Sequence, residues 1–421
     1  MLTLKLPTQV IHKKRMSPIL PSVLQSLISR FRRMDLLLCG IAFGLTGFGV
    51  AMIASVSVFE SYQLTERLAA EGIISEPTNS FYLWRGFFHM VIGVFVMIVI
   101  ACIPYHFWRY FAHIIFLGTL LLVFALFIPG LSNEYGSAQS WLVIGGFSIQ
   151  PSEFLKLSLI FYLALWLQKR EQHVSTLKEG FLPFATLLLI STFPIALQPD
   201  LGSFIVLSAI AVTMFFLAGG NVLHLALGTA IAGASGLPLI LQKEYIRDRF
   251  KVFLFPDSPT FSETIGFQIQ QALIAIGSGG PFGVGYGKSV QKFGYLPEVQ
   301  ADMIFAAMAE ELGFFRILII LGLYGFFVYR GFTIAREAPD RFGFLVASGI
   351  TMWVAFQAII NIAVNTALFP LTGLTLPFIS YGGSSHVALL AGVGVLLNIS
   401  MHTHEKYARV RRSSHWFPAL R

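Results

Sequence analysis

Six stretches of this chain contain no Asp, Glu, Lys or Arg and are long enough to cross a lipid bilayer, which takes about 20 predominantly apolar residues. Only 12% of the 421 residues are charged, whereas a soluble protein carries about 25%. This deficit excludes an ordinary soluble fold and places most of the chain in hydrocarbon. The stretches are Leu36–Phe59, Gly86–Trp108, Tyr110–Asn133, Phe181–Pro199, Leu201–Gln242 and Phe342–His404.

The last two stretches are each long enough for two spans. Gly219-Gly220-Asn221 divides the first of them, and a Gly/Pro-rich segment at about 369–383 divides the second. Two further spans tolerate charges, at Pro151–Gln168 and at about Leu312–Tyr329. The sequence therefore predicts an all-α polytopic membrane protein with ten transmembrane helices and a large outer loop between spans seven and eight.

The distribution of basic residues tests this count, because Lys and Arg concentrate in cytoplasmic loops. With the N-terminus inside, 19 of the 29 Lys and Arg residues fall on the cytoplasmic side, and 15 of the 21 Asp and Glu residues fall outside. Both termini are then cytoplasmic. The net charge of +8 follows from topology and from attraction to anionic membrane lipids, so it does not indicate a nucleic-acid partner.

The spans divide the chain into a basic tail at 1–34, a membrane domain at 35–402 and a second basic tail at 403–421. Ile19–Arg33 fits either a short amphipathic helix on the cytoplasmic surface or a disordered tail. No signal-peptide pattern is present. Cys39 and Cys102 both lie within predicted spans, so we expect neither a disulfide nor a cysteine metal site.

Three predicted loops lie on the outer side, at 60–84, 130–150 and about 243–300. The third is long enough to be functional or disordered. Phe253, Phe255, Phe261, Phe267 and Ile269 recur in it at amphipathic spacing. We therefore expect it to contain ordered helices that rest on the membrane surface.

Polar residues from distant segments reach the same outer level. Glu153 and Lys156 are three residues apart at the start of the fourth span, so they share one helix face. Ionisable groups at membrane depth are costly and usually face a cavity. We therefore predict a polar pocket open to the outer leaflet, to which the contributors are Glu153, Lys156, Gln198, Asp200, Glu298, Asp302 and Ser384.

Each motif also has a purely structural explanation. Gln198-Pro199-Asp200-Leu201-Gly202 fits a capped turn, and Glu153 with Lys156 fits an ion pair that neutralises a span end. The glycines at 277–287 lack the spacing and ending of a P-loop, so a flexible loop is expected there. Trp141 fits an interfacial anchor as well as a residue that stacks on a substrate.

Four motifs, together with the ten spans, resemble the signatures of the SEDS (shape, elongation, division and sporulation) family, in the family's order, over about residues 35–402. Gly283-Val284-Gly285 and Gly373-Leu374-Thr375-Leu376-Pro377 look like the FtsW division branch, whereas His402-Thr403-His404 is similar to the RodA elongation branch. The four motifs are Gln150-Pro151-Ser152-Glu153 with Lys156, Gln198-Pro199-Asp200-Leu201-Gly202, Tyr295-Leu296-Pro297-Glu298 through Asp302 to Glu310-Glu311-Leu312-Gly313, and Leu376-Pro377-Phe378-Ile379-Ser380-Tyr381-Gly382-Gly383-Ser384.

The resemblance implies a peptidoglycan glycosyltransferase that polymerises lipid II at the outer face of the bacterial inner membrane during cell division, at the septum, with Asp302 as the catalytic residue. It also implies a class B penicillin-binding protein as transpeptidase partner, together with other division membrane proteins. A lipid II flippase, the elongation polymerase and a non-catalytic scaffold are the alternatives. Two positions depart from the family pattern: Ser140 replaces the common Arg before Trp141, and Ala301 and Met303 flank Asp302 in place of Thr and Phe.

Glycan extension requires the 4-hydroxyl of one sugar to attack the anomeric carbon of another and displace a lipid pyrophosphate. A positioned carboxylate contributes about 10²–10⁴-fold to such a step, and Asp302 is the predicted general base. Lys156 and Lys292 are the predicted cations for the leaving pyrophosphate. No cofactor is certain; a Mg²⁺ or Mn²⁺ held partly by phosphate is left open, with its protein ligands unknown.

Overall fold

The computed structural model describes residues 34–128, 132–135, 138–144, 147–240, 242–255 and 265–414. The predicted amphipathic helix at the N-terminus lies outside these residues. The chain is mainly helical, as predicted, and its elements in order are α2 (Leu36–Val56), α3 (Val58–Ala70), α4 (Phe81–Cys102), α5 (His106–Ala125), β1 (Ser132–Tyr135), β2 (Ala138–Ile144), β3 (Phe147–Ile149), α6 (Pro151–Lys169), η1 (Leu177–Phe181), α7 (Leu182–Leu197), α8 (Leu201–Leu217), α9 (Val222–Ile240), α10 (Glu244–Leu254), α11 (Ile265–Gly279), α12 (Ile304–Leu312), α13 (Phe314–Glu337), α14 (Arg341–Asn365) and α15 (Gly383–Ser414).

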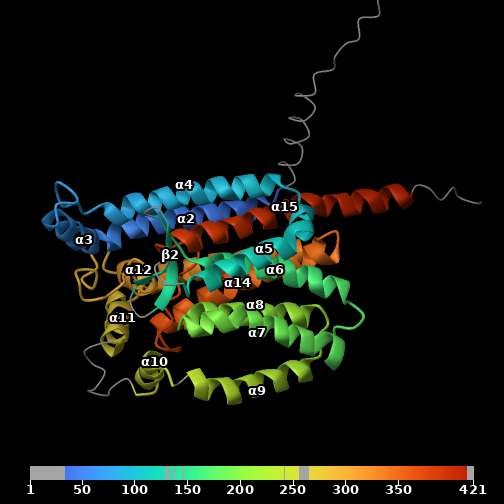
Figure 1. Ribbon diagram of the computed structural model, residues 1–421. Helices are drawn as coiled ribbons and strands as arrows, with labels where there is room; N and C mark the ends of the chain where they lie inside the picture. The colour runs from blue at the N-terminus through green and yellow to red at the C-terminus, as the bar shows by residue number, and fades with distance from the viewer. Residues whose placement is uncertain are drawn as a thin grey trace, which may run out of the picture.

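The long helices run side by side as a bundle (Figure 1). Helices α14 and α15 are its most enclosed members, because 78% and 89% of their apolar spans are buried, against 22% for α4 and α5. The main packing pairs are α15 with α4, α5 with α6, and α13 with α14. Most side chains on α14 are therefore surrounded by protein.

Seven helices in the described part of the chain are long and apolar enough to cross a membrane: α2, α4, α5, η1 with α7, α13, α14 and the first part of α15. Helices α6, α8 and α9 occupy the positions of the other three predicted spans. Helices α8 and α9 have shorter apolar segments, and α6 carries Glu153 and Lys156 in its buried face. The chain is a multi-pass membrane protein, while the total of ten spans stays a prediction.

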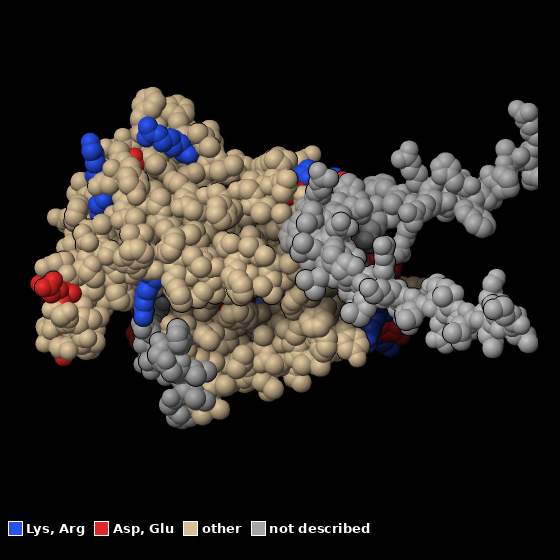
Figure 2. All heavy atoms as spheres, turned by 90° about the horizontal axis from the view of Figure 1, so that it is seen from above, with Lys and Arg blue, Asp and Glu red and all other residues tan. Residues whose placement is uncertain are grey.

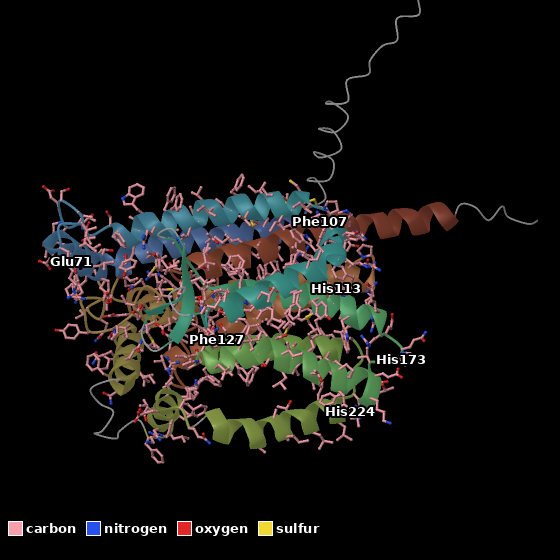
Figure 3. All side chains as sticks on the ribbon, viewed as in Figure 1. Glu71, Phe107, His113, Phe127, His173 and His224 are labelled. Atoms are coloured by element: carbon pink, nitrogen blue, oxygen red, sulfur yellow. The ribbon has the colours of Figure 1, made fainter. Side chains whose placement is uncertain are left out.

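The short elements gather at one end of the bundle, where α3, α10, α11, α12 and β2 lie together (Figure 1). Charged side chains on the face in Figure 2 collect toward the two ends and leave an uncharged band between them. Figure 3 places Glu71 at the end with the short elements, and His173 and His224 toward the opposite end. All three predicted outer loops thus share one end of the molecule.

The prediction of an all-α chain is wrong at residues 132–149. This segment forms a three-stranded antiparallel sheet in the order β1-β2-β3, with Asn133 opposite Trp141 and Val143 opposite Ser148. Each strand is too short to show the alternation that marks a strand by itself. The Gly145-Gly146 dipeptide between β2 and β3 in the sequence is typical of a hairpin turn, and it was the available signal.

The long outer segment contains two helices, α10 and α11, as predicted. The glycine-rich part that follows is hydrogen-bonded rather than free, which contradicts the expected flexible loop. The N–H groups of Val284 and Gly285 donate to the carbonyl oxygens of Glu310 and Glu311, over 2.9 and 3.0 Å. This part of the chain is therefore fixed to the end of α12.

Residues 366–382, here called the α14–α15 loop, are non-helical and yet largely buried at 370–380. A buried carbonyl without a donor costs about 1–3 kcal/mol, and side chains from four positions supply donors to this loop. The pairs are Arg249 with the Leu371 carbonyl, Asn361 with Leu374, Gln357 with Thr375, and Tyr324 with Pro377.

We predict that Gly49→Ala lowers the thermal unfolding midpoint of the purified protein in detergent. Helix α2 touches the α14–α15 loop at Gly49, where an added Cβ would meet Ile379 Cα at 2.6 Å and Phe378 O at 2.7 Å. Both are backbone atoms, so helix and loop would have to separate.

Gly47→Ala on the same helix is the matched control, because a Cβ there meets nothing within 4 Å. Ala is about 1 kcal/mol better than Gly inside a helix, so this variant should melt at or slightly above the unsubstituted protein. Equal midpoints for the two variants would contradict the close approach at Gly49.

Candidate functional site

Asp302 lies in the turn before α12, at the end of the bundle that holds the short elements. Its side chain is only 9% exposed, and Oδ1 has no hydrogen-bond partner in the described part of the chain. Burial, and after it the nearby Glu298, raise the pKa of Asp302 to about 7, while Arg249 and the N–H groups of Asp302 and Met303 oppose the rise. The carboxyl is therefore poised to accept or release a proton near neutral pH.

Glu298 lies four residues before Asp302 in a non-helical turn, and it has a left-handed backbone conformation with φ +52°. Loss of surrounding water raises its pKa as well. Glu60 on α3 has a raised pKa, caused by burial and then by Glu298. Glu298 thus acts on the carboxyl groups of both Asp302 and Glu60.

Arg249 is the site residue that the sequence analysis missed. It lies on α10 with 7% exposure, and its Nη1 donates to the Leu371 carbonyl over 2.8 Å. Burial lowers its pKa to about 10, against the attraction of Asp302 and Asp200. The sequence did carry a sign of its burial. Arg249 lies three residues after Ile246 and three before Val252, both buried, so it falls within the apolar stripe of an amphipathic helix.

Asp200 and Ser384 come together through the start of α6. Asp200 caps α8, because its Oδ1 accepts the Ser203 N–H over 2.9 Å, and its Oδ2 lies 3.4 Å from Gln150 Nε2 and 3.5 Å from Ser152 Oγ. The Gln150 N–H donates to Ser384 Oγ over 3.0 Å. The capped-turn explanation is thus correct for Asp200, which also faces the same groups as Ser384 and acts electrostatically on Arg249.

Glu153 and Lys156 form an ion pair of 2.7 Å inside the bundle, with both side chains buried. Lys156 Nζ also donates to Gln357 Oε1 over 3.3 Å and lies 5.6 Å from the centre of the Trp353 ring. The structure therefore realises the ion-pair explanation. A role in substrate binding stays a prediction.

Lys292 belongs to a second buried ion pair, with Glu311 at 3.2 Å. Its ammonium group also donates to the Gly287 carbonyl over 2.7 Å and to Ser55 Oγ over 3.4 Å. A lysine has three N–H donors, so all of them are engaged. Lys292 therefore joins the outer segment to α12 and α2. Its predicted contact with substrate stays a prediction.

The remaining predicted residues are placed as follows. Trp141 lies half-buried on β2, next to the buried Ser140. Gln198 is buried, and its Nε2 donates to the Val123 carbonyl over 3.1 Å, which joins α7 to α5. The site therefore consists of Asp302, Glu298, Arg249, Asp200 and Ser384, with Lys156 and Glu153 deeper in the bundle and Lys292 in its own cluster.

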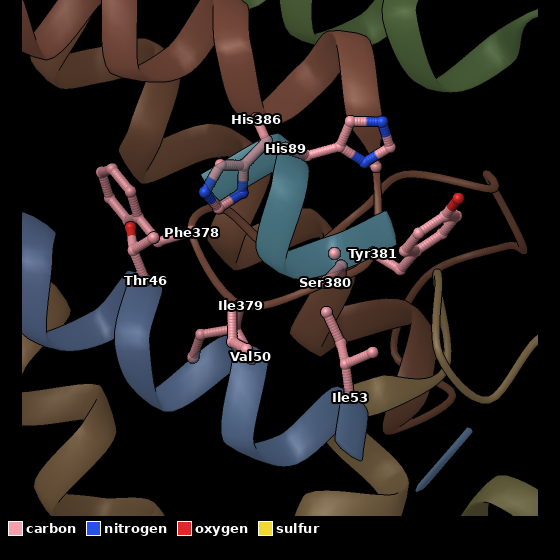
Figure 4. A pocket seen from close by; sticks show the side chains of 11 residues that line it. Thr46, Val50, Ile53, His89, Phe378, Ile379, Ser380, Tyr381 and His386 are labelled. Atoms are coloured by element: carbon pink, nitrogen blue, oxygen red, sulfur yellow. The ribbon is translucent and has the colours of Figure 1, made fainter. Parts of the chain in front are cut away.

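A small cavity of about 10 Å³ lies beside the α14–α15 loop, between α2, α4 and α15. Figure 4 shows His89, His386, Ser380 and Tyr381 around it. This volume suits about one water molecule, so it is too small for a sugar. The Tyr381 N–H donates to the Gln300 carbonyl over 2.9 Å, which ties this part of the loop to the segment that carries Asp302.

The described residues include no group of three or more His, Cys, Asp or Glu that could hold a metal ion. Mg²⁺ at phosphate sites is usually held by one or two carboxylates together with substrate phosphates. A divalent cation here would therefore have to arrive with a phosphorylated substrate.

Comparisons with known proteins cover nearly the whole chain. Residues 35–405 match the family of cell cycle proteins that comprises FtsW, RodA and SpoVE. Stage V sporulation protein E of Bacillus subtilis strain 168 is 39% identical over 372 residues, which are 88% of this chain and 97% of the relative. The probable peptidoglycan glycosyltransferase FtsW of Trichlorobacter lovleyi is 36% identical over 372 residues, which are 88% and 94% of the two chains.

Solved structures give the same result. A chain of a peptidoglycan synthase complex that coordinates polymerization and crosslinking superposes with a TM-score of 0.71 at 27% identity, over 89% of this chain and 98% of its own. The rod shape determining protein RodA of Thermus thermophilus superposes with a TM-score of 0.62 at 26% identity, over 89% and 98%. The sequence motifs, the fold and the relatives agree, and the chain belongs to the SEDS family of FtsW, RodA and SpoVE cell cycle proteins.

Proposed function

We propose that this protein is a peptidoglycan glycosyltransferase that polymerises lipid II at the outer face of the bacterial inner membrane, with Asp302 as general base. The observation that carries the proposal is a buried carboxyl group with a pKa of about 7 beside a buried arginine. Several relatives at 36–37% identity are named as probable peptidoglycan glycosyltransferases. The same relatives favour a role in cell division at the septum.

In this proposal, Asp302 takes the proton of the attacking 4-hydroxyl as the new glycosidic bond forms. The bond between the anomeric carbon and the pyrophosphate breaks, and the lipid pyrophosphate leaves as an anion. A leaving group that departs as an anion needs a cation rather than a strong general acid. A divalent ion brought by the pyrophosphate would add to that positive charge.

Arg249 is the proposed cation for the pyrophosphate. Lys156 and Lys292 each form an ion pair away from Asp302, with Glu153 at 2.7 Å and Glu311 at 3.2 Å. Arg249 is the cation that acts electrostatically on Asp302, and a guanidinium presents a planar fork of donors that matches phosphate oxygens. It would also supply the positive charge that Ser140 does not.

The membrane arrangement and partner follow from the same family. We propose ten spans with both termini in the cytoplasm, and Asp302 on the outer side, where a lipid II headgroup lies. The structural relative from a synthase complex supports a class B penicillin-binding protein as the partner. The ten proposed spans are α2, α4, α5, α6, η1 with α7, α8, α9, α13, α14 and α15.

We expect Asp302→Asn to abolish lipid II polymerisation by the purified protein in detergent, with or without the partner transpeptidase. In the unsubstituted protein, the rate should fall as pH decreases through about 7, because protonated Asp302 cannot accept the hydroxyl proton.

Glu71→Gln, at an exposed position at the same end of the molecule, is the control and should polymerise normally. Glycan synthesis by Asp302→Asn at the normal rate would refute the assignment of the base. A protein that transports lipid II without polymerising it in detergent would support the flippase alternative.

Arg249→Gln should lower kcat by about 10²-fold or more, as removal of one electrostatic group from an enzyme site typically does. Arg249→Lys should recover part of the rate, since it keeps the charge and loses the fork. Arg247→Gln is the matched control, because Arg247 lies on the same helix, is exposed, and pairs with Glu244 and Asp248 at the surface. Equal rates for the Arg249 and Arg247 variants would remove Arg249 from the mechanism.

Lys156→Met should destabilise the protein by about 3–5 kcal/mol, because it leaves the Glu153 carboxylate buried and unpaired. The double variant Glu153→Gln, Lys156→Met should recover the unfolding midpoint, since buried ion pairs are often replaceable without loss of stability. Lys156 is also predicted from the sequence to contact substrate, and on that prediction the folded double variant is inactive in lipid II polymerisation. A double variant with normal activity would reduce the pair to a structural role.

A further inference from the structure

We propose that three amide side chains on one face of α14 are positioning residues for the transfer reaction, fixing Asp302 and the α14–α15 loop without touching substrate. They are Gln357, Asn361 and Asn365, here called the amide ladder. Residues four apart lie above one another on a helix, and all three are at most 1% exposed. This inference rests on the proposed function and deepens it.

Two members of the ladder hold Asp302 by its backbone. Nδ2 of Asn361 and Nδ2 of Asn365 each donate to the Asp302 carbonyl oxygen over 2.9 Å, which fills both lone pairs of that oxygen. Oδ1 of Asn365 accepts the Ala306 N–H over 3.1 Å, one of the N–H groups that a helix start leaves without a partner. Helix α14 therefore anchors both Asp302 and the first turn of α12.

The ladder also holds the loop and Lys156. The second N–H of Asn361 donates to the Leu374 carbonyl over 2.7 Å, and Gln357 Nε2 donates to the Thr375 carbonyl over 3.0 Å. Gln357 Oε1 lies 3.3 Å from Lys156 Nζ. One rigid helix thus fixes three parts of the candidate site that are far apart in the sequence.

The chemistry of Asp302 explains why such anchoring is needed. A carboxylate that must accept a proton cannot also be held by strong side-chain donors, since these would stabilise the charged form and lower its pKa. Asp302 Oδ1 accordingly has no hydrogen-bond partner among the described residues. Its position has to be set through the backbone, and the carbonyl group with its two amide donors does this.

The test compares Asn361→Leu and the milder Asn361→Ser with Asn398→Leu, in the full-length protein. Asn398 is a matched control on α15: it is equally buried, its Nδ2 donates to the Ala101 carbonyl over 2.7 Å, and its Oδ1 accepts the Tyr105 N–H over 2.8 Å. All three variants lose similar buried hydrogen bonds. Unfolding midpoint, kcat, KM for lipid II and the pH dependence of kcat are measured for each.

We expect the Asn361 variants to lose about 10- to 100-fold in kcat with little change in KM, as small misplacements of a catalytic group do. The acid limb of their pH profile should move to lower pH, because a loosened Asp302 turn admits water to the carboxyl. Asn361→Ser keeps a polar side chain and serves if Asn361→Leu does not fold. Asn398→Leu should lower only the unfolding midpoint.

An Asn361→Ser protein with normal kcat and an unmoved acid limb would overturn the inference. The same kcat loss in Asn398→Leu would overturn it too, since the effect would then be one of general stability. In either case an inactive Asp302→Asn protein would leave the proposed function intact. An active Asp302→Asn protein would instead remove the general base on which the inference rests.

Discussion

The structure depends on one constraint: inside an apolar helix bundle, buried backbone polar groups have to find their partners within the chain. The α14–α15 loop is the severest case, because its backbone is non-helical and largely buried at 370–380. Four of its carbonyl groups accept hydrogen bonds from side chains of α10, α13 and α14. Non-helical backbone can exist at such depth only where protein supplies these partners. The loop that contains Ser380 and leads to Ser384 at the start of α15 is thus held in one conformation.

The same constraint separates the cations of the site. Lys156 and Lys292 each share a buried carboxylate, and together with Glu153 and Glu311 they form two neutral pairs. Such pairs fix the positions of the helices, but their opposite charges cancel and attract a substrate anion only weakly. Arg249 interacts electrostatically with both Asp302 and Asp200, and burial raises the pKa of Asp302 to about 7. The cation that acts on Asp302 is therefore a residue that the sequence motifs did not single out.

The sequence could predict features that depend on neighbouring residues, but not contacts between residues far apart in the chain. Apolar stretches located the long helices, and three-residue spacing brought Glu153 to Lys156, because both signals are local. The partner of Lys292 is Glu311, and that of Lys156 includes Gln357, at sequence separations of 19 and 201 residues. No local pattern encodes such contacts. The strands at 132–149 were missed because they are short. Arg249 was missed because, among the charged residues Arg247, Asp248 and Lys251, it looks like an ordinary surface charge.

Burial of the Asp302 carboxyl group lowers the stability of the folded protein at neutral pH. Its ordinary pKa of 3.8 rises to about 7 in the folded chain, so the folded state binds a proton more tightly than the unfolded state between those two values. The free energy of unfolding therefore falls as pH rises through that window. At neutral pH the buried carboxyl group of Asp302 therefore destabilises the folded protein. The hydrogen bonds from Asn361 and Asn365 to the Asp302 carbonyl keep the residue from moving into water. Proton affinity and fixed position at Asp302 thus arise from a single arrangement, in which burial sets the first and α14 sets the second.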